Sequence, residues 1–205
     1  MKRLLALLLA LLAATPVFAQ SVVQTENVRA ELLADASAIK PGEPFWVGLR
    51  QTIRPKWHTY WKNPGDSGLP TEITWKLPEG AKADPIVWPR PHLFDISGVT
   101  NYGFKDEAVL LVRITPPANA AGSFKLAAEA NWLVCEDVCI PEDGKFTLSL
   151  PVTATGAPAP PATRAIFDKA RQQVPVPSPW PARYGVAKSG ESTFTLAKCH
   201  RQVAS

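Results

Sequence analysis

The segment SFKLAAEANWLVCEDVCIPEDGKFTLSLPV, residues 123–152, carries the clearest strand signal in the chain and two of its three cysteines. Apolar residues take every second position before the cysteines and again after them: Phe124, Leu126, Ala128, Ala130, Trp132 and Val134, then Phe146, Leu148, Leu150 and Val152. A period of two with one apolar face is typical of antiparallel strands. Cys135 falls on the other face, so the pattern predicts that it points away from the core.

Shorter rows of the same period occur at residues 28–32, 45–49, 73–77 and 108–114. Turn-forming residues separate the rows, in the groups Lys40-Pro41-Gly42, Asn63-Pro64-Gly65-Asp66, Pro78-Glu79-Gly80 and Glu142-Asp143-Gly144. Several short strands with turns between them predict an all-β fold, an immunoglobulin-like antiparallel β-sandwich.

The composition is that of a globular chain, with 205 residues, 46% of them hydrophobic and 20% charged. The formal net charge of +4 comes without a block of basic residues, so we expect no nucleic acid as a partner.

The first twenty residues, MKRLLALLLALLAATPVFAQ, resemble an export signal. Two basic residues precede an apolar run at 4–14, and Val17-Phe18-Ala19 is a small-residue cleavage site. We therefore predict a signal peptide at 1–19 and a periplasmic location, where a cysteine pair can be oxidised.

The end of the chain is rich in proline, with eight prolines between residues 151 and 181. This density predicts a semi-rigid linker at 154–182 after a domain at 20–153, with a helical turn or more near 165–172. Residues 183–205 are too few for a core of their own, so we expect a partial second segment or a truncated tail.

Cys135 and Cys139 form the pair of interest, and Cys199 is left as a bystander. An extended chain would hold Cys135 and Cys139 roughly 13 Å apart at about 3.3 Å per residue. A disulfide needs Cα atoms about 5.5 Å apart, so residues 136–138 must form a three-residue turn. Spacing alone leaves a redox-active pair and a structural staple equally open. The three histidines are scattered, and we expect no metal and no cofactor.

Acidic residues surround this pair, with Glu136 and Asp137 between the cysteines and Glu142 nearby. Negative charge disfavours a thiolate and should raise the cysteine pKa values. This favours the disulfide, so we expect a reductant rather than a strong oxidant.

The segment WLVCEDVCIPE at 132–142 resembles the N-terminal periplasmic domain of the DsbD/ScsB thiol–disulfide interchange reductases. Three further segments fit the same family, namely WHTYWKNPGDSG at 57–68, IVWP at 86–89 and NYGF at 101–104. The resemblance covers roughly residues 25 to 153. The spacing of its two cysteines is closer to that of the ScsB-like branch than to that of DsbD, where the cysteines are further apart.

The resemblance implies roles for individual residues. Cys139 would attack and be attacked by partners, with Cys135 as the resolving thiol. Aromatic side chains would line the site at Tyr60 and at His58, which stands where the family has a second tyrosine. From the histidine itself, without the resemblance, we expect His58 to pack at the surface. Asn101, Tyr102 and Phe104 would belong to a loop that caps the cysteines, with Asn101 at a phenylalanine position of DsbD.

The resemblance further implies a component of a protein-disulfide reductase. Its electron donor would be a membrane-embedded reductase domain absent from this chain, and its acceptors would be periplasmic thioredoxin-fold proteins. Two alternatives remain: a non-catalytic β-sandwich binding module with a structural disulfide, and a copper-tolerance protein that handles Cu(I).

Overall fold

The computed structural model describes residues 21–96, 98–177, 182–189 and 192–199. The chain divides after Val174 into two compact units. The expected signal peptide, residues 1–19, lies outside the described residues. Within the described part, no helix is long and apolar enough to cross a membrane.

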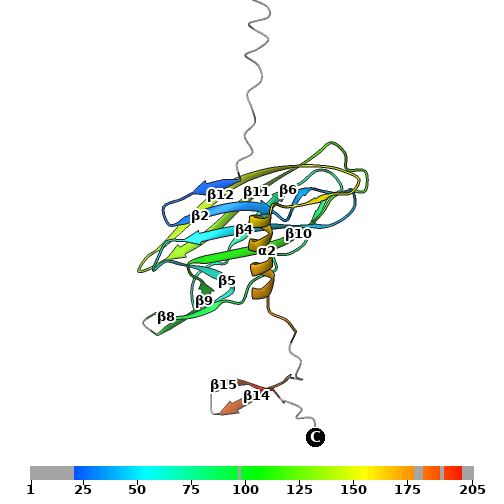
Figure 1. Ribbon diagram of the computed structural model, residues 1–205. Coiled ribbons are helices and arrows are strands. Elements are labelled where there is room, and N and C mark those ends of the chain that lie inside the picture. Colours follow the sequence, from blue (N-terminus) through cyan, green and yellow to red (C-terminus); the bar gives the residue numbers. More distant parts are fainter. Residues whose placement is uncertain (1–20, 97, 178–181, 190–191, 200–205) are drawn as a thin grey trace, which may run out of the picture. The chain divides into compact units, whose positions relative to one another are not determined.

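The first unit contains two antiparallel sheets (Figure 1). One has the order β1-β2-β4-β10-β7, with bounds Val22–Gln24, Val28–Ala34, Phe45–Ile53, Glu107–Thr115 and Lys82–Ala83. The other has the order β12-β11-β5-β9-β8, with bounds Cys139–Pro151, Ser123–Cys135, His58–Gly65, Val99–Phe104 and His92–Ile96; β6 (Glu72–Lys76) also pairs with β11. A small ladder joins β3 (Ala36–Ala38) to β13 (Ala157–Pro158).

The apolar rows of the two sheets meet in one core, as the period of two predicts. In β2 every second residue is buried, and the same side of β11 is buried from Phe124 to Val134. Phe45 and Phe124 meet edge to face with their ring centroids 6.0 Å apart. The all-β immunoglobulin-like sandwich is therefore confirmed.

Two of the expected turns lie in strands instead. Asn63, Pro64 and Gly65 form the end of β5, and only Asp66 follows that strand. Glu142-Asp143-Gly144 lies inside β12, where Gly144 pairs with Ala130 of β11. Pairing with a long neighbouring strand overrides the local turn preference of these three residues.

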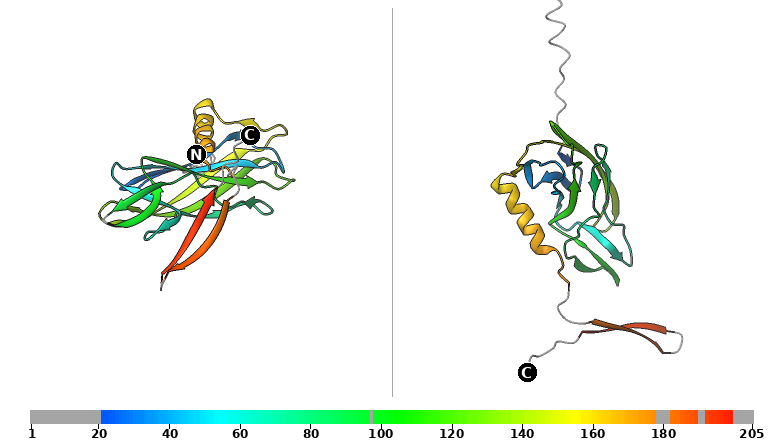
Figure 2. Two further views of the ribbon diagram at one scale, coloured as in Figure 1. Left: turned by 90° about the horizontal axis from the view of Figure 1, so that it is seen from below. Right: turned by 90° about the vertical axis from the view of Figure 1, so that its right-hand side faces the viewer.

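The expected linker at 154–182 differs most from the structure. Residues 161–173 form the helix α2 (Pro161–Gln173), which lies against the outer face of the β2-β4-β10 sheet (Figure 2). Phe167 and Ala170 are buried there against Val109 and Leu111 of β10. Proline is compatible with the first turn of a helix, because the amide hydrogens there have no helical partner. The first unit therefore extends to Val174, beyond the predicted boundary at 153.

The second unit contains β14 (Ala182–Ser189) and β15 (Ser192–Cys199), which pair as an antiparallel hairpin. They correspond to the segment expected at 183–205, of which residues 200–205 lie outside the described residues.

Candidate functional site

The two cysteines close the hairpin between β11 and β12. The strands stay in register from Ser123 opposite Pro151 to Cys135 opposite Cys139, where the Cα atoms are 4.2 Å apart and the sulfurs form a disulfide. Residues 136–138 make the connection, and the Glu136 amide donates to the Val138 carbonyl at 3.2 Å. The predicted three-residue turn is thus confirmed.

The disulfide is open on one side only. Cys139 is exposed, whereas Cys135 is 2% exposed. Cys135 does lie outside the main apolar core, as the strand alternation predicts. Cys135 is nevertheless closed to solvent, because side chains of β5 cover that face of β11. An incoming thiolate can reach Cys139 without moving the domain, but not Cys135.

Tyr60 supplies the contact to the buried sulfur. His58 of β5 pairs with Cys135 of β11, and Tyr60, two residues further along β5, shares the face of His58. The Tyr60 hydroxyl donates to Cys135 Sγ at 3.1 Å and lies 3.8 Å from Cys139 Sγ. Burial raises the pKa of Tyr60, an effect that the Ser67 hydroxyl partly opposes. Tyr60 therefore stays protonated and can donate to a thiolate on Cys135.

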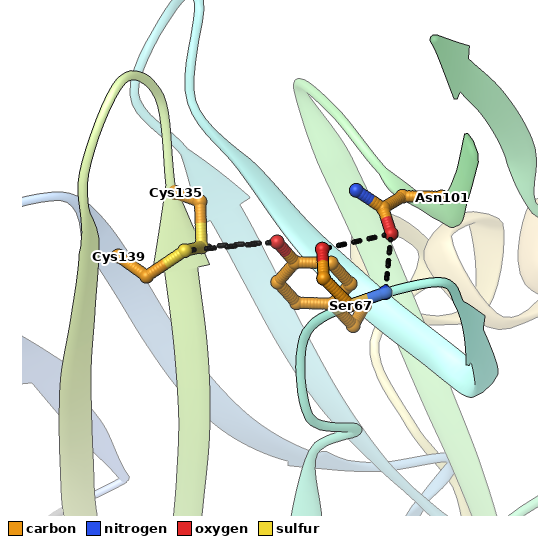
Figure 3. Close-up of a disulfide and its surroundings, with 5 residues drawn as sticks. Ser67, Asn101, Cys135 and Cys139 are labelled. Carbon is orange, nitrogen blue, oxygen red and sulfur yellow. Dashed lines mark hydrogen bonds between the residues drawn. A yellow bond between two sulfur atoms is a disulfide. The ribbon is translucent and has the colours of Figure 1, made fainter. Parts of the chain in front are cut away.

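A loop after β5 lies on the tyrosine ring. Asn101 Oδ1 accepts hydrogen bonds from the Ser67 amide and the Ser67 hydroxyl, both at 3.1 Å (Figure 3). Gly68 has a φ of +91°, and a Cβ there would come within 2.2 Å of the Tyr60 ring. Only glycine allows this approach. Asn101 is buried and holds the loop, and through it Tyr60, in place.

His58 is the second side chain next to the pair. It is 3% exposed, and its ring stacks on Phe94 of β8 at 4.8 Å and meets Tyr60 edge to face at 5.2 Å. The expectation of surface packing is wrong, because β8 pairs with β9 and carries Phe94 over the imidazole. Burial lowers the pKa of His58, so its ring is neutral at pH 7.

Two of the expected cap residues face elsewhere. Tyr102 packs edge to face on Trp61 at 6.5 Å, and Phe104 stacks on Trp88 at 6.3 Å within the core. Phe104 pairs with Thr59 across β9 and β5, so the two side chains lie on the same face of the sheet, toward the core. Tyr60, the next residue of β5, lies on the opposite face. Tyr102 and Phe104 thus do not line the disulfide.

The acidic residues near the pair differ in their surroundings. Asp137 is exposed and Glu136 is half-buried, both in the turn between the cysteines. Glu142 is buried, and its carboxylate accepts hydrogen bonds from the Asn27 amide at 3.0 Å, from Trp132 Nε1 at 3.1 Å and from the Thr25 hydroxyl. Glu142 therefore ties β12 to the segment that joins β1 to β2. In the described part of the chain, no group of three or more His, Cys, Asp or Glu could hold a metal ion.

Three contributors to the site were not predicted as site residues: Ser67, Gly68 and Phe94. No local pattern in the sequence identifies Phe94 as a site residue. It pairs with Asn101 across β8 and β9, which places its ring on the same face of the sheet as Asn101. Finding it requires the strand register, which the sequence does not contain.

Comparison with known proteins identifies a family and a shared fold. The family model for the N-terminal region of the thiol:disulfide interchange protein DsbD matches residues 28–151. The N-terminal periplasmic domain of ScsB from Proteus mirabilis shares the fold with a TM-score of 0.60 and 19% identity, over 87% of this chain and 81% of that one. The reduced DsbD N-terminal domain of Neisseria meningitidis matches with a TM-score of 0.39 and 17% identity, over 58% of this chain and 83% of that one. Among curated proteins, none has a sequence that matches this chain.

The hydrogen bond from Tyr60 to Cys135 should affect the rate at which the disulfide opens. In Tyr60→Phe the departing Cys135 thiolate loses a donor, so attack by a small dithiol should slow by about tenfold, which corresponds to about 1.4 kcal/mol. Stopped-flow reduction with dithiothreitol measures this rate.

Tyr102→Phe is the matched control, because it removes a hydroxyl from a ring that packs on Trp61 rather than at the pair. Equal rates in Tyr60→Phe and the wild-type protein would contradict the assigned role of the hydroxyl.

Proposed function

Because this chain belongs to the family of DsbD N-terminal domains, we propose that it relays electrons between proteins through Cys135 and Cys139. Its donor is a membrane-embedded reductase module, and its acceptors are thioredoxin-fold proteins of the periplasm. The proposal rests on the unequal exposure of the two cysteines. Cys139 is open to solvent, whereas Cys135 is buried against the Tyr60 hydroxyl.

The domain is reduced in two exchange steps. A thiolate of the donor attacks Cys139 Sγ, the bond between Cys139 and Cys135 breaks, and Cys135 leaves as a thiolate that accepts the hydrogen bond from Tyr60. A second donor thiolate then attacks the donor sulfur of the mixed disulfide, and Cys139 leaves. The domain gains two electrons and two protons, and the donor becomes a disulfide.

Delivery of the electrons runs in the opposite direction. The Cys139 thiolate attacks the disulfide of an acceptor, and Cys135 then attacks Cys139 Sγ and releases the reduced acceptor. Val138, in the turn next to Cys139, is 62% exposed and offers an apolar contact for either partner. The exposure of Cys139 supports its assignment as the cysteine that partners reach.

A location in the periplasm fits this function. The proposed export signal at residues 1–19 would deliver the domain there, and the buried Cys135 sulfur is shielded from oxidants of that compartment.

The acids in the turn should make the pair more reducing. Neutralising them in Glu136→Gln/Asp137→Asn should favour the thiolates and raise the reduction potential. The increase should be on the order of 10 mV, because Asp137 is exposed and Glu136 is only half-buried. The effect requires thiolates, so the potential is measured against a thiol buffer near the ordinary cysteine pKa of about 8.5.

Asp143→Asn neutralises an exposed acid further along β12 and serves as the control. A lower potential in the double variant would refute the electrostatic argument.

The relay itself is tested by trapping. Cys135→Ser leaves Cys139 without its resolving partner, so a mixed disulfide with an acceptor persists. In periplasmic extract this variant should capture a thioredoxin-fold protein, identified by mass spectrometry after non-reducing electrophoresis.

Cys139→Ser, which retains Cys135 and Cys199, should capture nothing. Capture by both variants, or by neither, would count against a relay through Cys139. If in addition the wild-type pair resists alkylation after mild reduction, the disulfide is a structural staple.

A further inference from the structure

His58 carries a buried nitrogen that the fold leaves unused. The side chain is 3% exposed, and its Nε2 has no hydrogen-bond partner among the described residues. A buried polar atom without a partner costs about 1–3 kcal/mol, so an unpaired nitrogen in a tightly covered position needs an explanation.

The position of His58 connects it to the redox pair. His58 lies directly opposite Cys135 in the antiparallel ladder of β5 and β11. Side chains of such a pair share one face, with their Cβ atoms about 4.5–5.5 Å apart. Phe94 stacks on the outer face of the imidazole and Tyr60 meets its edge, so the ring is held beside Cys135.

We propose that His58 accepts the proton of Cys135 when the reduced domain delivers its electrons. This inference rests on the proposed function and adds a general base to it. In the mixed disulfide, Cys135 is a buried thiol that must lose its proton before it can attack.

The Cys135 thiol gives its proton to the imidazole, and its sulfur attacks Cys139 Sγ. The bond between Cys135 and Cys139 forms, and the bond from Cys139 to the acceptor sulfur breaks. The acceptor sulfur leaves as a thiolate with the electron pair and is then protonated, while the imidazolium returns its proton to solvent. The domain dithiol is oxidised and the acceptor disulfide is reduced.

The other titratable groups near the pair are less suited to this task. Tyr60 is protonated and donates to the sulfur, so it cannot take the proton. Glu136 and Asp137 sit in the turn beyond the pair, and His92 is exposed on β8, where its ring meets Phe94 at 6.4 Å. His58 is neutral because its burial disfavours the imidazolium, and a neutral imidazole can accept a proton at pH 7.

A two-phase reaction separates the two cysteines. The reduced full chain, with Cys199→Ser so that only the pair reports, reacts with an aryl disulfide that releases a coloured thiolate. The first release reports attack by Cys139, and the second reports attack by Cys135 on the mixed disulfide. His58→Phe should leave the first phase intact and slow the second by about 100-fold, a typical contribution of a general base. His58→Gln gives a second variant without a base, and His92→Phe is the matched control.

The pH profile adds a readout that a packing role would not change. With His58 present, the rate of the second phase should not change with pH between pH 7 and the pKa of the cysteine. Without it the rate should rise about tenfold per pH unit, because only the thiolate fraction of Cys135 reacts. An unchanged second phase in both His58 variants, after a normal first phase, overturns this inference and leaves the relay standing. Absence of the first phase in the wild-type protein overturns the relay as well.

Discussion

The register of one hairpin determines the rest of the site. β11 and β12 pair without a break until Cys135 stands opposite Cys139, and the turn of residues 136–138 then brings the two sulfurs together. Because strand alternation places Cys135 off the core, its sulfur needs a separate cover. The pairing of β5 with the end of β11 provides one, since it places His58 and Tyr60 on the face of Cys135. A register shift of one residue would turn these side chains into the core.

The two sulfurs are covered differently, and the proposed relay depends on this difference. The buried sulfur accepts a hydrogen bond from the Tyr60 hydroxyl. Asn101 holds the position of Tyr60 indirectly, because it binds Ser67 in the loop that lies on the tyrosine ring. The exposed sulfur remains open to a partner. A symmetric, fully exposed pair would react with any thiol or oxidant, whereas a fully buried pair would require the domain to open. In the proposed relay, a protein partner begins the exchange at the exposed sulfur, and the buried sulfur completes it.

The sequence predicted the strands with a clear period of two, namely β2, β4, β6, β10, β11 and β12, but not β5, β8 or β9. It also predicted the turn between the cysteines and the family, because these depend on local periodicity and on contiguous motifs. The burial of Cys135 and His58 was not predictable in this way. It depends on β8, β9 and the loop after β5, which reach the pair through long-range pairing. Helix α2 was only partly predicted. The many prolines around it indicated a linker, although the first turn of a helix accepts proline. Tyr102 and Phe104 illustrate a different error: neighbours in a strand face opposite sides, so Asn101 and Tyr102 could not both line the pair.

The central claim is that the disulfide opens by attack at Cys139, and one measurement tests it most directly. The oxidised wild-type chain is mixed with an excess of a small monothiol and quenched with acid, and fragmentation of the 135–139 peptide locates the adduct. We predict that the monothiol is attached to Cys139 and that Cys135 is a free thiol. Attachment to Cys135, or an equal division between the two cysteines, would contradict the account.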